Sequence, residues 1–66
     1  MKGTVKWFNA GKGYGFITGE DGIDYFAHFT QIQAEGYRSL EQGQSVSFDV
    51  AEGPKGANAT NIVKEN

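Results

Sequence analysis

The sequence predicts an all-β fold, namely one small antiparallel barrel of five short strands. Ten glycines are spread along the 66 residues, and segments of strand-like composition lie between them. No segment repeats its apolar residues with the 3.6-residue period of an amphipathic helix. A chain of this length is expected to form a single domain, residues 1–66. Closure into a barrel removes the unpaired strand edges that so small a sheet could not otherwise protect.

Three strands are expected in the first half of the chain. The first spans residues 4–9, and Gly11-Lys12-Gly13 supplies a short turn into the second strand, residues 14–18. Glu20-Asp21-Gly22 has the composition of a hairpin turn, which places the third strand at residues 24–29.

The second half contains a long connection and two further strands. Residues 30–44 join the third strand to the fourth, and one helical turn is expected near Gln31. Residues 45–51 alternate between apolar and polar side chains, as expected for a strand with one buried face. Gly53-Pro54-Lys55-Gly56 is the turn before the fifth strand, residues 58–64.

The alternation along the strands also predicts the core of the barrel. We expect Ile32 and Leu40 of the long connection to lie beneath the sheet. Tyr25 is expected to reach the rim of the barrel, where its hydroxyl remains in water. The inward-facing residues are expected to be Val5, Ile17, Ala27, Ile32, Val46, Phe48, Val50 and Ile62.

Composition argues against several classes of function. The chain has no cysteine and one histidine, so disulfides and the common zinc sites are not expected, nor is any metal or cofactor. No serine lies in a nucleophile-elbow context, and an enzyme is therefore not expected. Glu20, Asp21 and Asp24 surround a turn glycine and are expected to be solvated charges. The lack of a long apolar segment and of a signal-peptide pattern favours a cytoplasmic protein without membrane contact.

The segment Lys12-Gly13-Tyr14-Gly15-Phe16-Ile17 is the most informative one in the sequence. On an extended strand, Lys12, Tyr14 and Phe16 share one face, while the opposite face carries two glycines and one isoleucine. An aromatic surface beside a cation suits the stacking of nucleic-acid bases. The two rings lie about 7 Å apart along the strand, whereas bases in one strand of a duplex repeat every ~3.4 Å. Separated bases of a single strand therefore fit better than an intact duplex.

The neighbouring strands extend this aromatic surface. Phe26 and His28 share one face of the third strand, and Phe29 follows them. In the first strand Trp7 and Phe8 alternate, and a bulge or strong twist would expose both. The alternative is that the rings fill a core, and for a single ring such as Phe8 the two interpretations have equal weight. A barrel of 66 residues, however, cannot enclose six rings together with its aliphatic residues; the six are those of Trp7, Tyr14, Phe16, Phe26, His28 and Phe29.

The charge distribution supports a phosphate-bearing ligand although the net charge does not. The net charge is −2, whereas most nucleic-acid-binding domains are basic. Lys2, Lys6 and Lys12 all precede the first acidic residue, Glu20, so the field near the aromatic strand is expected to be positive. A surface for proline-rich peptides or sugars is the alternative, and the flanking lysines favour phosphate over those ligands.

A set of motifs extends over almost the whole chain, from about Lys2 to Lys64. The motifs are Gly3-x-Val5-Lys6-Trp7-Phe8-Asn9, Lys12-Gly13-Tyr14-Gly15-Phe16-Ile17, Phe26-x-His28-Phe29, Gly36-Tyr37-x-x-Leu40, Gly43-Gln44 and Gly53-Pro54-Lys55-Gly56. This set closely resembles the bacterial cold-shock proteins. The resemblance implies a five-stranded OB-fold barrel with Greek-key topology that binds single-stranded RNA and DNA. It also implies an ATP-independent RNA chaperone that regulates transcription or translation during cold shock or stress.

The resemblance further implies which residues bind the ligand and what that ligand is. Tyr14 and Tyr37 stand where phenylalanine is common in the family, and they retain a stacking face. Tyr25, Ala27 and Ala57 are departures that bear on stability more than on binding. We expect a mild preference for pyrimidines, no small-molecule substrate, and a monomer, with a strand-swapped dimer as the alternative. The implied nucleic-acid-binding residues are Lys6, Trp7, Phe8, Asn9, Lys12, Tyr14, Phe16, Phe26, His28, Phe29 and Tyr37, with Arg38 and Lys55 as peripheral phosphate contacts.

Overall fold

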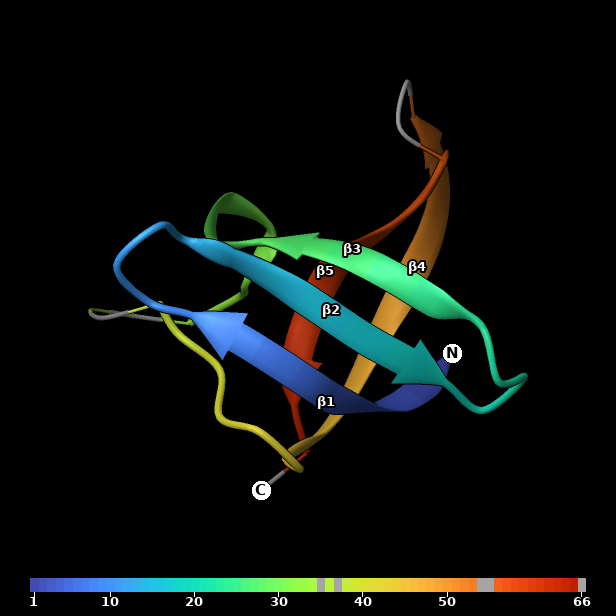
Figure 1. The fold of residues 1–66 in the computed structure, drawn as a ribbon, viewed down its shortest axis with the longest axis horizontal. Helices are drawn as coiled ribbons and strands as arrows, with labels where there is room; N and C mark the ends of the chain where they lie inside the picture. The colour runs from blue at the N-terminus through green and yellow to red at the C-terminus, as the bar shows by residue number, and fades with distance from the viewer. Residues whose placement is uncertain (35, 37, 54–55, 66) are drawn as a thin grey trace.

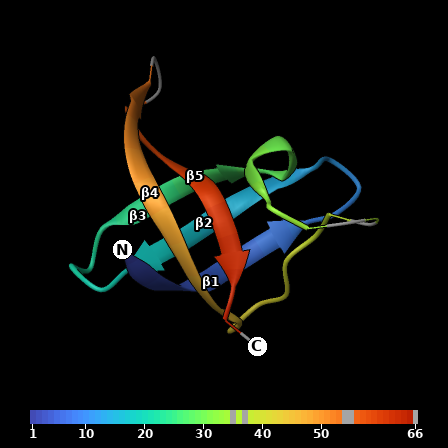
Figure 2. The same ribbon diagram turned by 180° about the vertical axis from the view of Figure 1, so that it is seen from behind.

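The computed structural model describes residues 1–34, 36, 38–53 and 56–65, which form five strands and one short 3₁₀ helix. The elements are β1 (Lys2–Asn9), β2 (Tyr14–Gly19), β3 (Asp24–His28), η1 (Phe29–Gln31), β4 (Ser45–Gly53) and β5 (Gly56–Lys64). The strands close into a barrel in the order β1-β2-β3-β5-β4. In Figure 1, β1, β2 and β3 form the front layer and β4 and β5 cross behind it; Figure 2 shows the same two layers from the opposite side, with β4 and β5 in front. The predicted all-β barrel is confirmed.

All five predicted strands are present, and their ends differ by a few residues from the prediction. β1 begins at Lys2 because its first residues pair with β4, and β4 continues to Gly53. Phe29 leaves the third strand and begins η1, where the Ile32 N–H donates to the Phe29 carbonyl at 3.1 Å. The helical turn expected near Gln31 is therefore present, and it begins two residues earlier.

The pairing pattern departs from a purely antiparallel sheet at one place. β3 and β5 run parallel and pair through Phe26 with Asn58 and Ala27 with Ala59, whereas the other neighbouring strands are antiparallel. The long connection helps to close the barrel beside this pair, because the Gln33 N–H donates to the Ile62 carbonyl at 2.7 Å. The parallel pair places the first part of β5 along the edge of β3.

Seven of the eight predicted core residues are buried, as is Leu40 of the long connection. Val50 is the exception, with 45% of its surface exposed, and its assignment to the core was wrong. The register between β4 and β5 shifts between Ser47 and Asp49, so the strict alternation assumed for this strand does not continue to Val50. Ala59 of β5 also belongs to the core.

Tyr25 is also buried in the core, which corrects the prediction that it lies at the rim with its hydroxyl in water. Only 4% of the residue is exposed, and its ring lies 5.3 Å from that of Phe48. The Tyr25 hydroxyl donates to Asp21 Oδ2 at 2.6 Å. This hydrogen bond lowers the pKa of Asp21 and raises that of Tyr25. Asp21 is therefore a structural partner and not merely a solvated turn charge.

Two further findings concern ligands and membranes. The described residues include no helix that is both long enough and apolar enough to span a bilayer. Within the same residues, no three acidic, cysteine or histidine side chains gather into a group that could hold a metal ion.

Candidate nucleic-acid interface

A bulge in β1 turns Trp7 toward the outer face of the barrel. The pairing of β1 with β2 shifts between Val5 and Trp7, so Lys6 is an extra residue and the alternation reverses after it. Val5 therefore faces the core, and Trp7, 38% exposed, lies opposite Phe16. The same reversal turns Phe8 inward, where it is half-buried and packs against the core. The bulge expected from the sequence is confirmed, but it exposes Trp7 without exposing Phe8 equally.

Rings from three strands and η1 form one continuous surface, which we call the aromatic face. The Phe16 ring centroid lies 5.5 Å from that of Trp7 and 5.8 Å from that of Phe26. Tyr14 lies 5.8 Å from Phe26 and 6.2 Å from Trp7. The residues of the aromatic face are Trp7, Tyr14, Phe16, Phe26, His28 and Phe29. Pairing across β1, β2 and β3 therefore gathers most of the described aromatic residues singled out by the sequence, whereas Phe8 points inward.

Gly15 is required by the close approach of β1 behind the aromatic face. A Cβ atom at this position would overlap the Trp7 carbonyl oxygen and lie 2.6 Å from the Phe8 Cα atom. Such distances are not tolerated between backbone atoms, so any side chain here would push the two strands apart. The bare inner face of β2 therefore allows the strand carrying Trp7 to pair with it.

Phe29 reaches the aromatic face from η1 and is held by the turn between β1 and β2. Its N–H donates to the Gly13 carbonyl at 2.8 Å, and its ring lies 4.8 Å from His28. Gly13 has a φ of +79°, and a Cβ atom there would lie 2.6 Å from the Phe29 ring. Glycine is favoured here both by the backbone conformation and by the packing of Phe29. Asn9 shapes the same turn, because its Oδ1 accepts the Lys12 N–H at 2.9 Å.

Lys6 beside the aromatic face forms an ion pair that the sequence did not indicate. Its Nζ lies 2.8 Å from Asp24 Oδ2, and the Thr18 hydroxyl donates to Asp24 Oδ1 at 2.8 Å. The Lys6 ammonium, together with this hydroxyl, holds the pKa of Asp24 below its ordinary value of 3.8. Asp24 is therefore not the simple solvated charge that was expected. A phosphate that approaches Lys6 has to compete with a carboxylate already bound to it.

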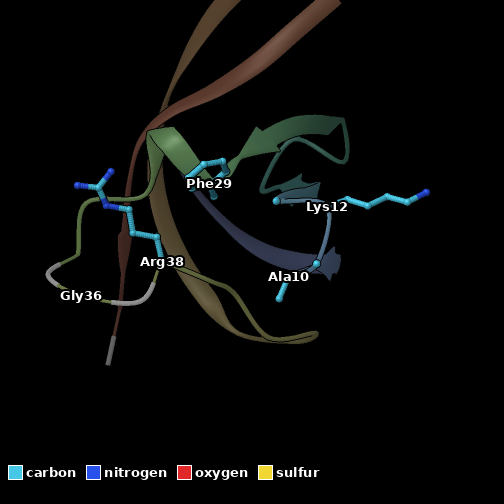
Figure 3. A pocket seen from close by; sticks show the side chains of 7 residues that line it. Ala10, Lys12, Phe29, Gly36 and Arg38 are labelled. Carbon is cyan, nitrogen blue, oxygen red and sulfur yellow. The ribbon is translucent and has the colours of Figure 1, made fainter.

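A groove of about 480 Å³ continues the aromatic face beyond Phe29. It lies between the turn at Ala10–Gly13 and the long connection, and Figure 3 shows the Phe29 ring within it. Lys12 and Arg38 line the groove, and in Figure 3 their side chains extend away from Phe29 on opposite sides. The Arg38 Nε donates to the Ala34 carbonyl at 3.4 Å. Two cations therefore flank a ring that is 40% exposed.

Two predicted contacts, Tyr37 and Lys55, lie outside the described residues. The structure in turn shows a second recess that the sequence did not predict, which we call the side hollow. It has a volume of about 140 Å³ and is lined by Phe26, His28, Gln31, Asn58, Ala59 and Thr60. Local sequence patterns could not indicate it, because it depends on the parallel pairing of β3 with β5.

Comparisons with known proteins agree with this geometry. The family described as 'Cold-shock' DNA-binding domain matches residues 1–65. The cold shock-like protein CspC of Bacillus cereus is 59% identical over 64 residues, which cover 97% of this chain and 98% of that protein. The major cold shock protein of Streptococcus pyogenes serotype M1 is 60% identical over 63 residues, covering 96% and 94% of the two chains. Cold shock protein 1 of Lactiplantibacillus plantarum is 59% identical over 63 residues, or 96% of each chain.

Proposed function

The chain belongs to the cold-shock domain family, and on this premise we propose that it acts as an ATP-independent RNA chaperone. Family membership makes the chain a protein that binds single-stranded nucleic acid and not an enzyme. The proposal concerns how it binds and to what effect: bases of single-stranded RNA or DNA stack on the aromatic face, and the bound strand is kept from pairing.

The observation that carries this proposal is the continuity of the aromatic face. Neighbouring ring centroids in the face lie 4.8–6.4 Å apart, so several bases of one strand can each meet a ring. Base–aromatic stacking contributes about 1–3 kcal/mol per base. Three or four stacked bases would therefore supply most of the affinity without a deep pocket.

The placement of the cations supports a phosphate backbone that runs along the edges of the aromatic face. Lys6 lies near one end of it, beside Asp24, and Lys12 and Arg38 lie around Phe29. With two or three phosphate contacts, the slope of log affinity against log salt for a single strand is expected to be about −1.4 to −2. A weak ionic contribution of this size agrees with a chain whose net charge is −2.

The proposed activity follows from stacking alone. Because every base has a π-face, the preference among sequences is expected to be mild, with a bias toward pyrimidines. A strand held by its bases is unavailable for pairing, so hairpins would open without nucleotide hydrolysis.

The proposal also covers the oligomeric state, the location and the cellular role of the protein. We propose that it is a monomer, with a strand-swapped dimer as the alternative, and that it is cytoplasmic. We further propose that it acts in transcription or translation during cold shock or stress.

Trp7 provides a direct test, because it is the single tryptophan and lies in the aromatic face. Its fluorescence should be quenched by oligo-dT and not by a proline-rich peptide or an oligosaccharide. Annealed RNA hairpins carrying a fluorophore and quencher should open on addition of the protein without ATP. Quenching by the peptide or sugar alone would reject nucleic acid as the ligand, and binding without hairpin opening would reject the chaperone activity.

A further inference from the structure

His28 is held by a contact that its place in the aromatic face does not explain. The backbone N–H of Thr30 donates to His28 Nδ1 at 3.3 Å, and the Thr30 hydroxyl lies 2.9 Å from the same nitrogen. His28 is thereby the N-terminal cap of η1, the short helix that begins with Phe29. The imidazole thus shapes the backbone that presents the next ring of the face.

This contact determines which nitrogen of the neutral ring carries the proton. A backbone N–H can only donate, so Nδ1 has to present its lone pair to Thr30. The proton of the neutral imidazole is therefore on Nε2, since the hydrogen bond made by one ring nitrogen sets the state of the other. The Thr30 hydroxyl favours the same tautomer, because it can donate to the same lone pair.

The ring held in this way lines the side hollow. The parallel pairing of Phe26 with Asn58 forms one wall of this recess, and Gln31 of η1 forms another. Among the described residues, no hydrogen-bond partner of His28 Nε2 is found. An imidazole whose Nε2 proton has no partner among the described residues therefore lines a recess of about 140 Å³ beside the Phe26 ring.

We propose that the side hollow is a base-edge recognition site, and that Thr30 is a positioning residue which fixes His28 as its donor. A pyrimidine stacked on the aromatic face near Phe26 extends its edge into the hollow, and a carbonyl oxygen of the base accepts the His28 Nε2 proton. The inference rests on the proposed function, because it assigns selectivity to the same nucleic-acid site. It extends that site across β3 to β5 and η1.

The tautomer is measured first, on the free protein. Long-range proton–nitrogen correlation spectra of the neutral imidazole distinguish the two tautomers. The proposal predicts protonated Nε2 in wild type and in Thr30→Val, which keeps the backbone N–H donor, and a shift toward a mixture of tautomers in Thr30→Pro, which lacks both the N–H and the hydroxyl. A wild-type ring protonated on Nδ1, or an unchanged tautomer in Thr30→Pro, would reject the role given to Thr30.

The donor is tested with oligo-dT and with oligomers in which sulfur, a poor acceptor, replaces thymine O2 or O4. A neutral hydrogen bond changes affinity by about 2- to 12-fold, so wild type should lose this factor on one sulfur-substituted oligomer. His28→Phe retains a stacking ring and should lose the distinction between oxygen and sulfur. Loss of the η1 cap weakens binding to all oligomers alike and so cannot imitate this result. The site would be rejected if wild type and His28→Phe distinguished oxygen from sulfur equally well, or if wild type did not distinguish them at all. The proposed function itself would be rejected if wild type bound none of the oligomers.

Discussion

Phe16 lies within the aromatic face between Trp7 and Phe26, and replacing it tests how much its ring contributes to binding and how much to stability. Phe16 is half-buried, and the centroid of its ring lies 5.5 Å from that of Trp7 and 5.8 Å from that of Phe26. Loss of one stacking partner costs about 1–3 kcal/mol of binding free energy, so Phe16→Ala should raise the dissociation constant for oligo-dT by about 5- to 160-fold. Two lost ring pairs at about 0.5–1.5 kcal/mol each would lower the free energy of unfolding by about 1–3 kcal/mol.

Binding should be followed by the anisotropy of a labelled oligo-dT, because Phe16 contacts Trp7 and the substitution would alter tryptophan fluorescence by itself. Stability should be followed by urea unfolding. Phe16→Leu retains apolar packing without a π-face, so it should lose most of the binding and less of the stability. Ile23→Ala is a matched control, since Ile23 is also a large apolar residue, is 53% exposed and is absent from the aromatic face. Full binding by folded Phe16→Leu would refute the stacking argument.

Three further substitutions test the packing and the two hydrogen-bonded carboxylates. Gly15→Ala should unfold the barrel or lower its melting temperature sharply, because the added Cβ overlaps the backbone of β1; an unchanged melting curve would contradict the close approach. Asp24→Asn should be less stable than wild type at neutral pH, and the difference should vanish as the pH falls below about 4, because the folded-state pKa of Asp24 is lowered and its contribution is lost on protonation. Tyr25→Phe should also be less stable than wild type at neutral pH, but this difference in stability should narrow above about pH 10. The pKa of Tyr25 is raised because its protonated phenol donates to Asp21, and this stabilising contribution is lost when the phenol ionises. Urea unfolding across pH measures both effects, and differences that do not change with pH would contradict them.

Much of the aromatic face could be predicted from the sequence because it depends on local alternation. Tyr14 with Phe16 and Phe26 with His28 each lie two residues apart on single strands, and antiparallel pairing then places the two pairs side by side. The outward position of Trp7 depends on a β-bulge in β1, and the sequence suggested a bulge without showing at which residue it lies. The structure locates it at Lys6, near where Val5 exchanges backbone hydrogen bonds with Gly43 and Gln44 of the long connection.

The features that sequence patterns missed depend on contacts between distant segments. Val50 fits a regular strand, and only the register shift between β4 and β5 exposes it. The pair formed by Lys6 and Asp24 joins residues 18 apart, and each charge alone is typical of a solvated side chain. The side hollow requires the parallel pairing of Phe26 with Asn58, which no local period indicates.

The affinity for matched single-stranded and duplex oligonucleotides tests the central claim most directly. Bases must lie on separate rings of the aromatic face, and a duplex keeps them stacked on one another. Anisotropy titrations at one salt concentration should therefore give a single-strand affinity at least about tenfold higher than that for the duplex, which corresponds to about 1.4 kcal/mol, less than two stacked bases would provide. Equal or tighter binding of the duplex would contradict the account.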